Sequence, residues 1–287
     1  MSIIPIKIKA FKLLQKIYAS VPRVIPGYLG KKFRAETAEK LIVIDEVNTK
    51  YGTAKYYCMG EIPLWRSKTL FIKEPETIEW IDKMDKDDLL WDIGSNVGLY
   101  SVYAGLKGMK VFAFEPSALN TFLISKNIEI NNLKDNVILF PIAISDQNEF
   151  GYLNMTSTDL GGAMHEFSEK DLKSVGDGDY EKQVVFKQGM LSYSMDELIK
   201  KYKFEVPNYI KIDVDSIEDK IIYGSRETLA SKRVKGLLIE LDETEVRTQK
   251  IIDFLAELGL ELKEKKHSEM IANSKFKTIF NYIFEKI

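Results

Sequence analysis

The chain has 287 residues, of which 45% are hydrophobic and 29% are charged, and its formal net charge is −2. This composition is too apolar for a disordered protein, and it lacks the basic footprint that a nucleic-acid binder needs. One cysteine and two histidines exclude an internal disulfide, a thiolate metal cluster and a His-rich metal site.

The N-terminal segment is predicted to form a basic amphipathic helix. Apolar residues from Phe11 to Val21 recur at helical spacing, and Lys9, Lys12 and Lys16 fall on the other side. Such a helix either lies on an anionic membrane or docks on its own domain, and both interpretations stay open. No apolar run approaches the ~20 residues of a membrane span. Because lysines also interrupt the apolar core that a signal peptide needs, we expect a cytoplasmic protein, with peripheral membrane association through this helix as an option.

Residues 22–70 are rich in proline and glycine and predict short irregular elements. Together with the helix they would form a small N-terminal cap over residues 1–70, and residues 71–287 would form the main domain.

From residue 89 onward, apolar runs and helical patterns alternate. Strands are predicted at residues 89–93, 110–114, 137–143, 209–212 and 236–241, and helices from about 99 to 106 and at 119–131, 217–230 and 248–258. This alternation predicts an α/β fold with a doubly wound, mostly parallel, Rossmann-like sheet. Residues 261–271 and 277–284, around a turn at Asn273 and Ser274, predict a C-terminal antiparallel hairpin that completes seven strands.

Residues 146–189 interrupt the alternation. They contain six glycines and nine acidic residues against four lysines, for a net charge of −5. A loop of this length inside a compact domain is usually functional or disordered. We expect a partly stranded insertion near the substrate mouth, whose charge favours a neutral or cationic acceptor.

A glycine turn from Asp92 to Gly98 follows the first strand and leads into a helix, which presents backbone N–H groups to a ligand. A phosphate-binding loop would end in Gly-Lys-Ser/Thr, which is absent, and a dinucleotide fingerprint needs glycines where Asn96 and Leu99 stand. The turn suits S-adenosylmethionine, which has no phosphates. Gly94 would let the backbone approach the methionyl part, and Asp92 would lie near its ammonium group.

Two later segments extend the predicted cofactor site. Glu115 follows Gly94 by 21 residues, at the end of the second strand and before Pro116, where a carboxylate accepts hydrogen bonds from both ribose hydroxyls. A carboxylate with this role occurs in both nicotinamide and adenosylmethionine sites. The alternative is that Glu115 is a solvated acidic residue at a strand end. Ala143 and Ile144 fall where an adenine ring would lie, or they form an ordinary apolar strand end.

These segments resemble the motifs of the FkbM-type methyltransferases. The matching runs are residues 90–101, 112–116, 143–146 and 211–214, followed by Gly224, Ile239 and Glu240. The resemblance covers residues 74–245, approximately, and implies a class I S-adenosylmethionine-dependent methyltransferase that usually acts on a hydroxyl oxygen. The predicted cofactor-binding residues are Asp92, Gly94, Ser95, Asn96, Gly98, Glu115, Pro116, Ala143, Ile144 and Asp213. The family usually has Glu-Gly after the fourth of these runs, where this chain has Asp215 and Ser216.

Methyl transfer to a hydroxyl requires that the hydroxyl be activated, either by a positioned base or by a divalent cation. Asp213 ends the fourth strand, and Glu240 and Asp242 end the fifth, so all three point to one crevice. Asp213 and Glu240 are the predicted catalytic carboxylates. The same three side chains are the predicted ligands if Mg²⁺ or Mn²⁺ takes part, and both routes stay open.

Other candidates have less specific signals. His165, in the insertion, is either a base that a glycine-hinged loop brings to the site or a surface histidine without a role. Glu218 and Asp219 are predicted to complement the dipole of the following helix. Trp65 and Trp80 are predicted to pack in the core and cap.

The sequence therefore predicts an S-adenosylmethionine-dependent O-methyltransferase that methylates a hydroxyl of a glycan or a small glycosylated metabolite. The alternative is a non-catalytic S-adenosylmethionine-binding or scaffolding subunit of a glycan-assembly complex. A nicotinamide oxidoreductase is disfavoured by the two missing glycines, and a nucleic-acid substrate by the charge and by the absence of an Asn/Asp-Pro-Pro-Tyr motif. The acceptor is expected to be a carbohydrate or another small molecule.

Overall fold

A computed structural model describes residues 12–17, 20, 25–176 and 181–287. The chain divides into two compact units, residues 1–43 and residues 44–287. The predicted boundary at residue 70 does not match this division, because Ala54, Tyr56 and Cys58 are buried in the same hydrophobic cluster as Leu90 and Val102. Residues 44–70 therefore belong to the core of the second unit.

The first unit contains two helical segments among its described residues. Residues 12–17 and 20 of the predicted N-terminal helix are helical, and its residues 11, 18, 19 and 21 lie outside the described residues. A second helix, α2 (Gly27–Lys40), begins after Pro26. This helix corrects the prediction of irregular elements from residue 22. No helix among the described residues is both long and apolar enough to cross a lipid bilayer.

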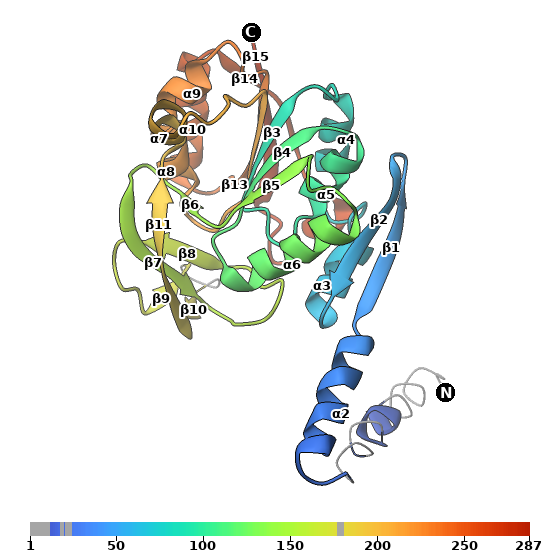
Figure 1. The fold of residues 1–287 in the computed structure, drawn as a ribbon. Coiled ribbons are helices and arrows are strands. Elements are labelled where there is room, and N and C mark those ends of the chain that lie inside the picture. The colour runs from blue at the N-terminus through green and yellow to red at the C-terminus, as the bar shows by residue number, and fades with distance from the viewer. Residues whose placement is uncertain (1–11, 18–19, 21–24, 177–180) are drawn as a thin grey trace. The chain divides into compact units, whose positions relative to one another are not determined.

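The second unit is built on a mostly parallel sheet with the order β14-β15-β13-β12-β3-β4-β5 (Figure 1). Its parallel strands are β3 (Leu89–Ile93), β4 (Lys110–Phe114), β5 (Val137–Phe140), β12 (Tyr209–Ile212) and β13 (Gly236–Asp242). β15 (Ile279–Lys286) pairs antiparallel with β13 and with β14 (Leu260–Lys266). The predicted α/β fold with a mostly parallel sheet is confirmed.

Side chains along the central strands alternate between two hydrophobic clusters, one on each face of the sheet. Leu89, Trp91 and Ile93 of β3 belong to one cluster, and Leu90 belongs to the other. Every residue of β3 is buried, as expected for a parallel strand with both faces covered.

Helices contribute to both clusters. One receives α4 (Pro75–Lys83), α5 (Leu99–Leu106) and α6 (Ala118–Ile130), and the other receives α7 (Met195–Tyr202), α8 (Glu218–Tyr223), α9 (Arg226–Ala230) and α10 (Val246–Glu257). A hairpin of β1 (Val43–Thr49) and β2 (Gly52–Cys58) and the helix α3 (Glu61–Lys68) precede α4. This hairpin and α3 are regular elements, whereas residues 22–70 were predicted to be irregular.

The insertion forms a sheet of its own, as its predicted partly stranded character suggested. The strand order is β6-β11-β7-β8, with β6 (Ala143–Ile144), β7 (Glu149–Met155), β8 (His165–Ser168) and β11 (Phe186–Tyr193). Two short strands, β9 (Ser174–Val175) and β10 (Lys182–Gln183), pair beside it.

Three predicted elements are shorter than expected. The third strand ends at Phe140 because Pro141 has no N–H to donate to a ladder, and Ala143 and Ile144 pair with β11 instead. The helix predicted at residues 217–230 divides into α8 and α9 at Gly224, where a Cβ would lie 2.4 Å from the Cα of Asp146. The strand predicted at residues 261–271 ends at Lys266, and Ser268 then caps the short helix α11 (Glu269–Ala272).

Candidate active site

The carboxyl ends of β3, β4, β12 and β13 border a cavity of about 380 Å³. Its other walls come from α3 and from segments 162–165 and 271–279. The chain continues from β3 to β4 on one side, whereas β12 lies on the other side of β3. The cavity therefore lies at the point where the strand order reverses, which is where open α/β sheets bind ligands.

Gly94 makes the closest backbone contact at this edge. Its φ is +81°, and a Cβ at this position would lie 1.9 Å from the carbonyl oxygen of Asp213. The N–H groups of Gly94 and Ser95 both donate to the carbonyl of Phe114, at 2.9 and 3.1 Å. Only glycine allows the turn after β3 to pack this closely against the end of β12.

Glu115 is held at the end of β4 by backbone donors. The N–H of Asn96 donates to its Oε2 and the N–H of Ser117 to its Oε1, both at 2.8 Å. The side chain lies in the cavity wall, although the residue is only 5% exposed. Burial raises the pKa of Glu115 to about 7, against the opposing effect of the two N–H groups.

Three buried polar atoms in the cavity wall make no hydrogen bond. Among the described residues, six buried side-chain nitrogen or oxygen atoms have no hydrogen-bond partner, and three of these line the cavity: Asn96 Oδ1, His165 Nε2 and Glu218 Oε2. Glu218 Oε2 still has an ion-pair contact with Arg247 at 3.2 Å. Because unsatisfied buried polar atoms are costly, these atoms indicate a site that a polar ligand completes.

A loop of the insertion closes one side of the cavity. The carbonyl of Gly162 accepts hydrogen bonds from the Nδ2 atoms of Asn96 and Asn120, at 2.8 and 3.2 Å. Gly161 donates its N–H to Asn120 Oδ1 at 3.0 Å and accepts from Arg66 Nε at 2.8 Å. The loop is thus fixed through its backbone by the glycine turn, α6 and α3.

Asp213, the predicted catalytic carboxylate, is paired with a buried lysine. Lys211 Nζ lies 2.6 Å from Asp213 Oδ2, and its side chain is 1% exposed. Burial acts to raise the pKa of Asp213, but the ammonium groups of Lys211 and Lys73 outweigh it and lower this pKa to about 2. Asp213 is therefore ionised at neutral pH.

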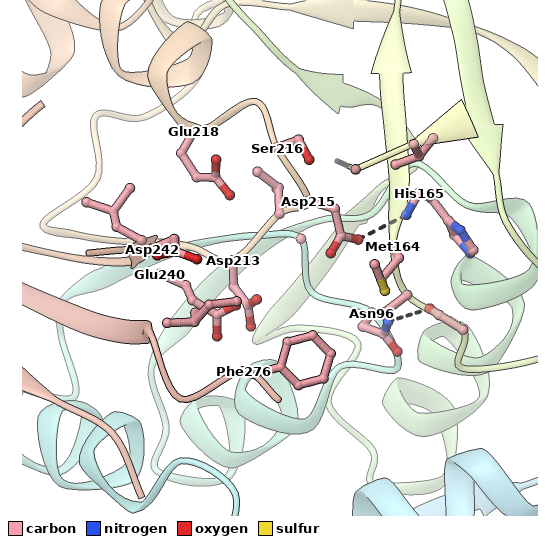
Figure 2. A pocket seen from close by; sticks show the side chains of 18 of the residues that line it. Asn96, Met164, His165, Asp213, Asp215, Ser216, Glu218, Glu240, Asp242 and Phe276 are labelled. Carbon is pink, nitrogen blue, oxygen red and sulfur yellow. Dashed lines mark hydrogen bonds between the residues drawn. The ribbon is translucent and has the colours of Figure 1, made fainter. Parts of the chain in front are cut away.

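Glu240 lies near Asp213 in the cavity wall, where Figure 2 shows both side chains. Burial, and then the negative charge of Asp213, raise the pKa of Glu240 well above its ordinary value. Lys73, which is ion-paired with Glu74, also lines the cavity. Although burial acts to lower the pKa of Lys73, the negative charges of Glu74 and Asp213 raise it. The site therefore combines one ionised and one protonated carboxyl group with two ammonium groups.

Asp215 and His165 connect the loop after β12 to the insertion. The N–H of His165 donates to Asp215 Oδ2 at 3.0 Å, as Figure 2 shows. Burial lowers the pKa of His165, so the imidazole is neutral at pH 7. Its Nδ1 accepts from the N–H of Thr156 at 3.4 Å, which leaves the ring proton on Nε2. In this tautomer the Nε2 atom of His165 is a hydrogen-bond donor, and the two alternatives for its role, a base or a histidine without a role, stay open.

The predicted cofactor residues separate into two groups. Gly94, Asn96, Glu115, Pro116 and Asp213 line the cavity, whereas Asp92, Ser95, Gly98, Ala143 and Ile144 are not among its lining residues. Asp92 is 1% exposed, and its Oδ2 accepts from Ser101 Oγ at 2.5 Å. Ala143 and Ile144 are buried in β6. The structure therefore does not place Asp92 at a ligand's ammonium group or these two residues at an adenine ring.

The predicted metal ligands do not form a cation site. Asp242 Oδ1 accepts from the N–H and Oγ1 of Thr244, and its Oδ2 accepts from Thr278 Oγ1. Asp213 is already paired with Lys211, and Lys73 lies close enough to affect both Asp213 and Glu240. No group of three or more His, Cys, Asp or Glu side chains in the described part of the chain could hold a metal ion. The donor set does not fit Mg²⁺ or Mn²⁺, and the positive charge at the site comes from lysine.

Several lining residues were missed or assigned elsewhere from the sequence. Trp65 was predicted to pack in the core or cap, but it is 42% exposed and lines the cavity, whereas Trp80 is buried as predicted. Lys211, which does not line the cavity but pairs with Asp213, had a visible signal, since it is a charged residue inside an apolar strand. Lys73 and Arg66 had none, because they precede β3 and reach the site only through the packing of α3 and α4.

Glu218 and Asp219 are in the first turn of α8, as predicted. They also contact Arg247 of α10, at 3.2 and 3.5 Å. Burial raises the pKa of Glu218 to about 8. At neutral pH Glu218 therefore presents a mostly protonated carboxyl group to the cavity.

The profile of the methyltransferase FkbM domain family matches residues 92–262, which is more than half of the chain. The chain belongs to this family. The match includes the glycine turn, Glu115, the insertion and the carboxylates at the ends of β12 and β13.

Individual relatives are distant. The hexuronic acid methyltransferase AglP of Haloferax volcanii is 24% identical over 188 residues, which cover 66% of this chain and 70% of that protein. The tRNA (uracil(54)-C(5))-methyltransferase of Pyrococcus furiosus is 26% identical over 43% of this chain and 28% of its own length. Among solved structures, the methyltransferase FkbM of Methylobacillus flagellatus is 12% identical, with a TM-score of 0.46, and the alignment covers 70% of this chain and 44% of that one. The magnesium protoporphyrin IX methyltransferase of Synechocystis, solved with bound SAM, is 9% identical, with a TM-score of 0.45. The alignment covers 79% of this chain and 82% of that one.

Ser216 provides a test of backbone strain at the site. It stands where the family motif usually has glycine, and its φ is +81°. A Cβ is disfavoured in this left-handed region by about 1–2 kcal/mol. We expect Ser216→Gly to raise the free energy of unfolding by about 0.5–1 kcal/mol in urea titrations, because the carbonyl that accepts from Arg247 remains. Ser216→Ala keeps the Cβ and should not stabilise, and equal stability of the two variants would contradict the assignment of strain.

Glu115 provides a test of burial. Because its pKa is raised to about 7, the native state binds the proton more tightly than the unfolded state does. Its contribution to stability is therefore present below pH ~4.5 and is lost as the pH rises through ~7. We expect the stability difference between the wild type and Glu115→Gln, measured by urea unfolding without ligand, to change by roughly 2 kcal/mol between pH 5 and pH 8. Parallel pH dependence in both proteins would contradict the raised pKa, since other titrating groups are common to both.

Proposed function

We propose that this chain transfers a methyl group from S-adenosylmethionine to a hydroxyl oxygen of a glycan or a small glycosylated metabolite. The observation that carries the proposal is one cavity in which Glu115 and the Gly94 turn lie next to Asp213 and Glu240. A predicted donor-binding edge and a pair of carboxyl groups thus share one cavity. The hexuronic acid methyltransferase AglP, although distant, supports a carbohydrate acceptor.

The donor side of the cavity fits S-adenosylmethionine. Each oxygen of Glu115 accepts one backbone N–H, so each keeps a lone pair for a ribose hydroxyl. Asn96 Oδ1 is buried without a hydrogen bond and can accept from a polar hydrogen of the bound donor. The volume of about 380 Å³ lies within the usual range of small-molecule pockets.

Bound S-adenosylmethionine supplies an electrophilic methyl group together with its leaving group. The protein has to align the acceptor oxygen, exclude water and receive the hydroxyl proton. Asp213 is ionised and can accept a hydrogen bond from the hydroxyl, which directs a lone pair of the oxygen away from the carboxylate. With a pKa of about 2, Asp213 is a weak base. It suffices if the proton leaves late, because an oxygen that is gaining a methyl group becomes strongly acidic.

Lysine charges keep this arrangement in place. Lys211 holds Asp213 in one orientation through a 2.6 Å contact, and Lys73 lies close enough to stabilise the ionised form. Glu240, with its raised pKa, keeps a proton and does not add a second negative charge beside Asp213. We propose Asp213 as the residue that orients and deprotonates the acceptor, and Glu240 as its neutral partner.

The acceptor is proposed to enter past Trp65. Its indole is 42% exposed and lines the cavity, and it makes no ring or cation contact within the described residues. Phe71, Phe122 and Tyr223 have similar exposure, but each packs against another ring. An exposed indole face beside a polar cavity suits a pyranose ring, which presents apolar C–H groups on one face and hydroxyls at its edge.

The proposal is tested by removing the buried ion pair as a unit. The double variant Asp213→Asn, Lys211→Met removes both charges of the pair, so that neither is left buried without its partner. We expect S-adenosylhomocysteine to bind within a few-fold of wild-type affinity in isothermal titration. We expect methyl transfer from labelled S-adenosylmethionine to a carbohydrate pool to fall by about 10²-fold or more. Lys200→Met, Glu227→Gln removes an exposed ion pair and serves as the matched control.

Three results would count against the proposal. If the wild type does not bind S-adenosylhomocysteine, the donor site is wrong. If it binds but transfers no methyl group to any carbohydrate, a non-catalytic subunit is the better interpretation. If the double variant keeps full activity, Asp213 does not activate the acceptor.

A second test concerns the acceptor side. We expect Trp65→Ala to raise KM for the acceptor by roughly 10-fold or more, because it removes apolar contact area, and to leave the affinity for S-adenosylhomocysteine unchanged. Phe122→Ala is the matched control, since Phe122 is also 42% exposed but does not line the cavity. An unchanged KM for the acceptor in Trp65→Ala would contradict the proposed stacking role of Trp65, but it would not contradict the proposed donor site.

A further inference from the structure

Residues 1–43 carry a charge opposite to that of the rest of the chain. They contain nine lysine and arginine residues and two glutamates, for a net charge of +7. Residues 44–287 contain 32 basic and 41 acidic residues, for a net charge of −9. The near-neutral total therefore conceals a strongly basic unit joined to an acidic one.

The same unit exposes a high density of large apolar side chains. Of the 25 large hydrophobic side chains that are exposed in the described residues, nine lie between residues 13 and 43. Tyr28 and Leu29 are 77% and 70% exposed. The one buried residue of α2 is Gly30. Exposed apolar surface of this density marks an interaction site rather than ordinary surface variation.

Basic and apolar residues alternate along the described helices of this unit. In the helical residues 12–17, Leu13, Leu14 and Ile17 share one side, and Lys12 and Lys16, four positions apart, share the other. In α2, the exposed side chains of Leu29 and Phe33 also lie four positions apart, close in sequence to Lys31, Lys32 and Arg34. Each helix thus presents ammonium or guanidinium groups beside apolar side chains.

We propose that residues 1–43 dock on an anionic lipid membrane as a peripheral anchor. An anionic bilayer surface satisfies both kinds of side chain, because its headgroups attract lysine and arginine while its interface accepts leucine, isoleucine and aromatic rings. A nucleic acid would pair the positive charges but leave the exposed leucines in water. A second copy that paired through the same unit would bring two units of charge +7 together. The charge and the apolar surface therefore favour a membrane over either of these partners.

The test is co-sedimentation of the full chain with vesicles. We expect binding to phosphatidylcholine vesicles that contain phosphatidylglycerol, little binding to pure phosphatidylcholine vesicles, and weaker binding as salt is raised. Neutralising four lysines with Lys12→Gln, Lys16→Gln, Lys31→Gln and Lys32→Gln should weaken partitioning by about fivefold per charge, or roughly 600-fold for the four charges together. Replacing Leu13, Leu14 and Ile17 by alanine should also weaken it, through the apolar contribution.

A matched control uses lysines of the second unit. Lys86, Lys134, Lys232 and Lys250 are exposed, and changing them to glutamine removes the same number of charges from the chain. This variant should sediment like the wild type, and all variants should bind S-adenosylhomocysteine with unchanged affinity. No binding to phosphatidylglycerol vesicles, or equal losses in both lysine variants, would overturn the proposal. Retention on RNA, or self-association through residues 1–43, without vesicle binding would assign the surface to another partner and overturn it too.

Discussion

The contact between the Gly94 turn and the carbonyl of Asp213 is the constraint on which the rest of the site depends. β3 and β12 pair in parallel with Ile93 opposite Ile212, so the two chains leave the sheet side by side. A Cβ on Gly94 would lie 1.9 Å from the Asp213 carbonyl, and therefore the turn can follow this path only with glycine. Two consequences follow from this packing. The turn delivers the N–H of Asn96 to Glu115, and the side chain of Asp213 reaches the same cavity as Glu115.

The electrostatics of the site follow from burying several ionisable groups together. A lone buried charge costs several kcal/mol, so the buried Lys211 requires a carboxylate partner, which Asp213 provides at 2.6 Å. Once Asp213 is ionised, its charge and burial together keep the proton on Glu240. Lys73 adds a second positive charge from the segment before β3. Lysine ammonium groups thus supply the positive charge that one of the two predicted routes assigned to a divalent cation, and this explains why three acidic residues at neighbouring strand ends do not form a cation site.

The insertion is held at the cavity by its backbone. The carbonyls of Gly161 and Gly162 and the N–H of His165 make the contacts to Arg66, Asn96, Asn120 and Asp215. Because backbone atoms of the loop make these contacts, the residue types of the loop do not reveal them. From the sequence, His165 suggested a catalytic role only because of its residue type. In the structure, its backbone N–H donates to Asp215 and helps to position the loop.

The sequence by itself determined the central sheet, the glycine turn and the presence of Glu115 and Asp213 at strand ends, because short apolar runs and a positive-φ glycine depend on local chemistry. Only the tertiary structure decided which of these residues share a cavity. It placed Asp92, Ala143 and Ile144 away from the cavity, satisfied Asp242 with threonine hydroxyls, and brought in Lys73, Arg66 and Trp65 from segments before the sheet. It also divided the helix after β12 at Gly224, where another loop approaches closely. These outcomes depend on contacts between residues far apart in the chain, and periodicity and spacing carry no information about such contacts.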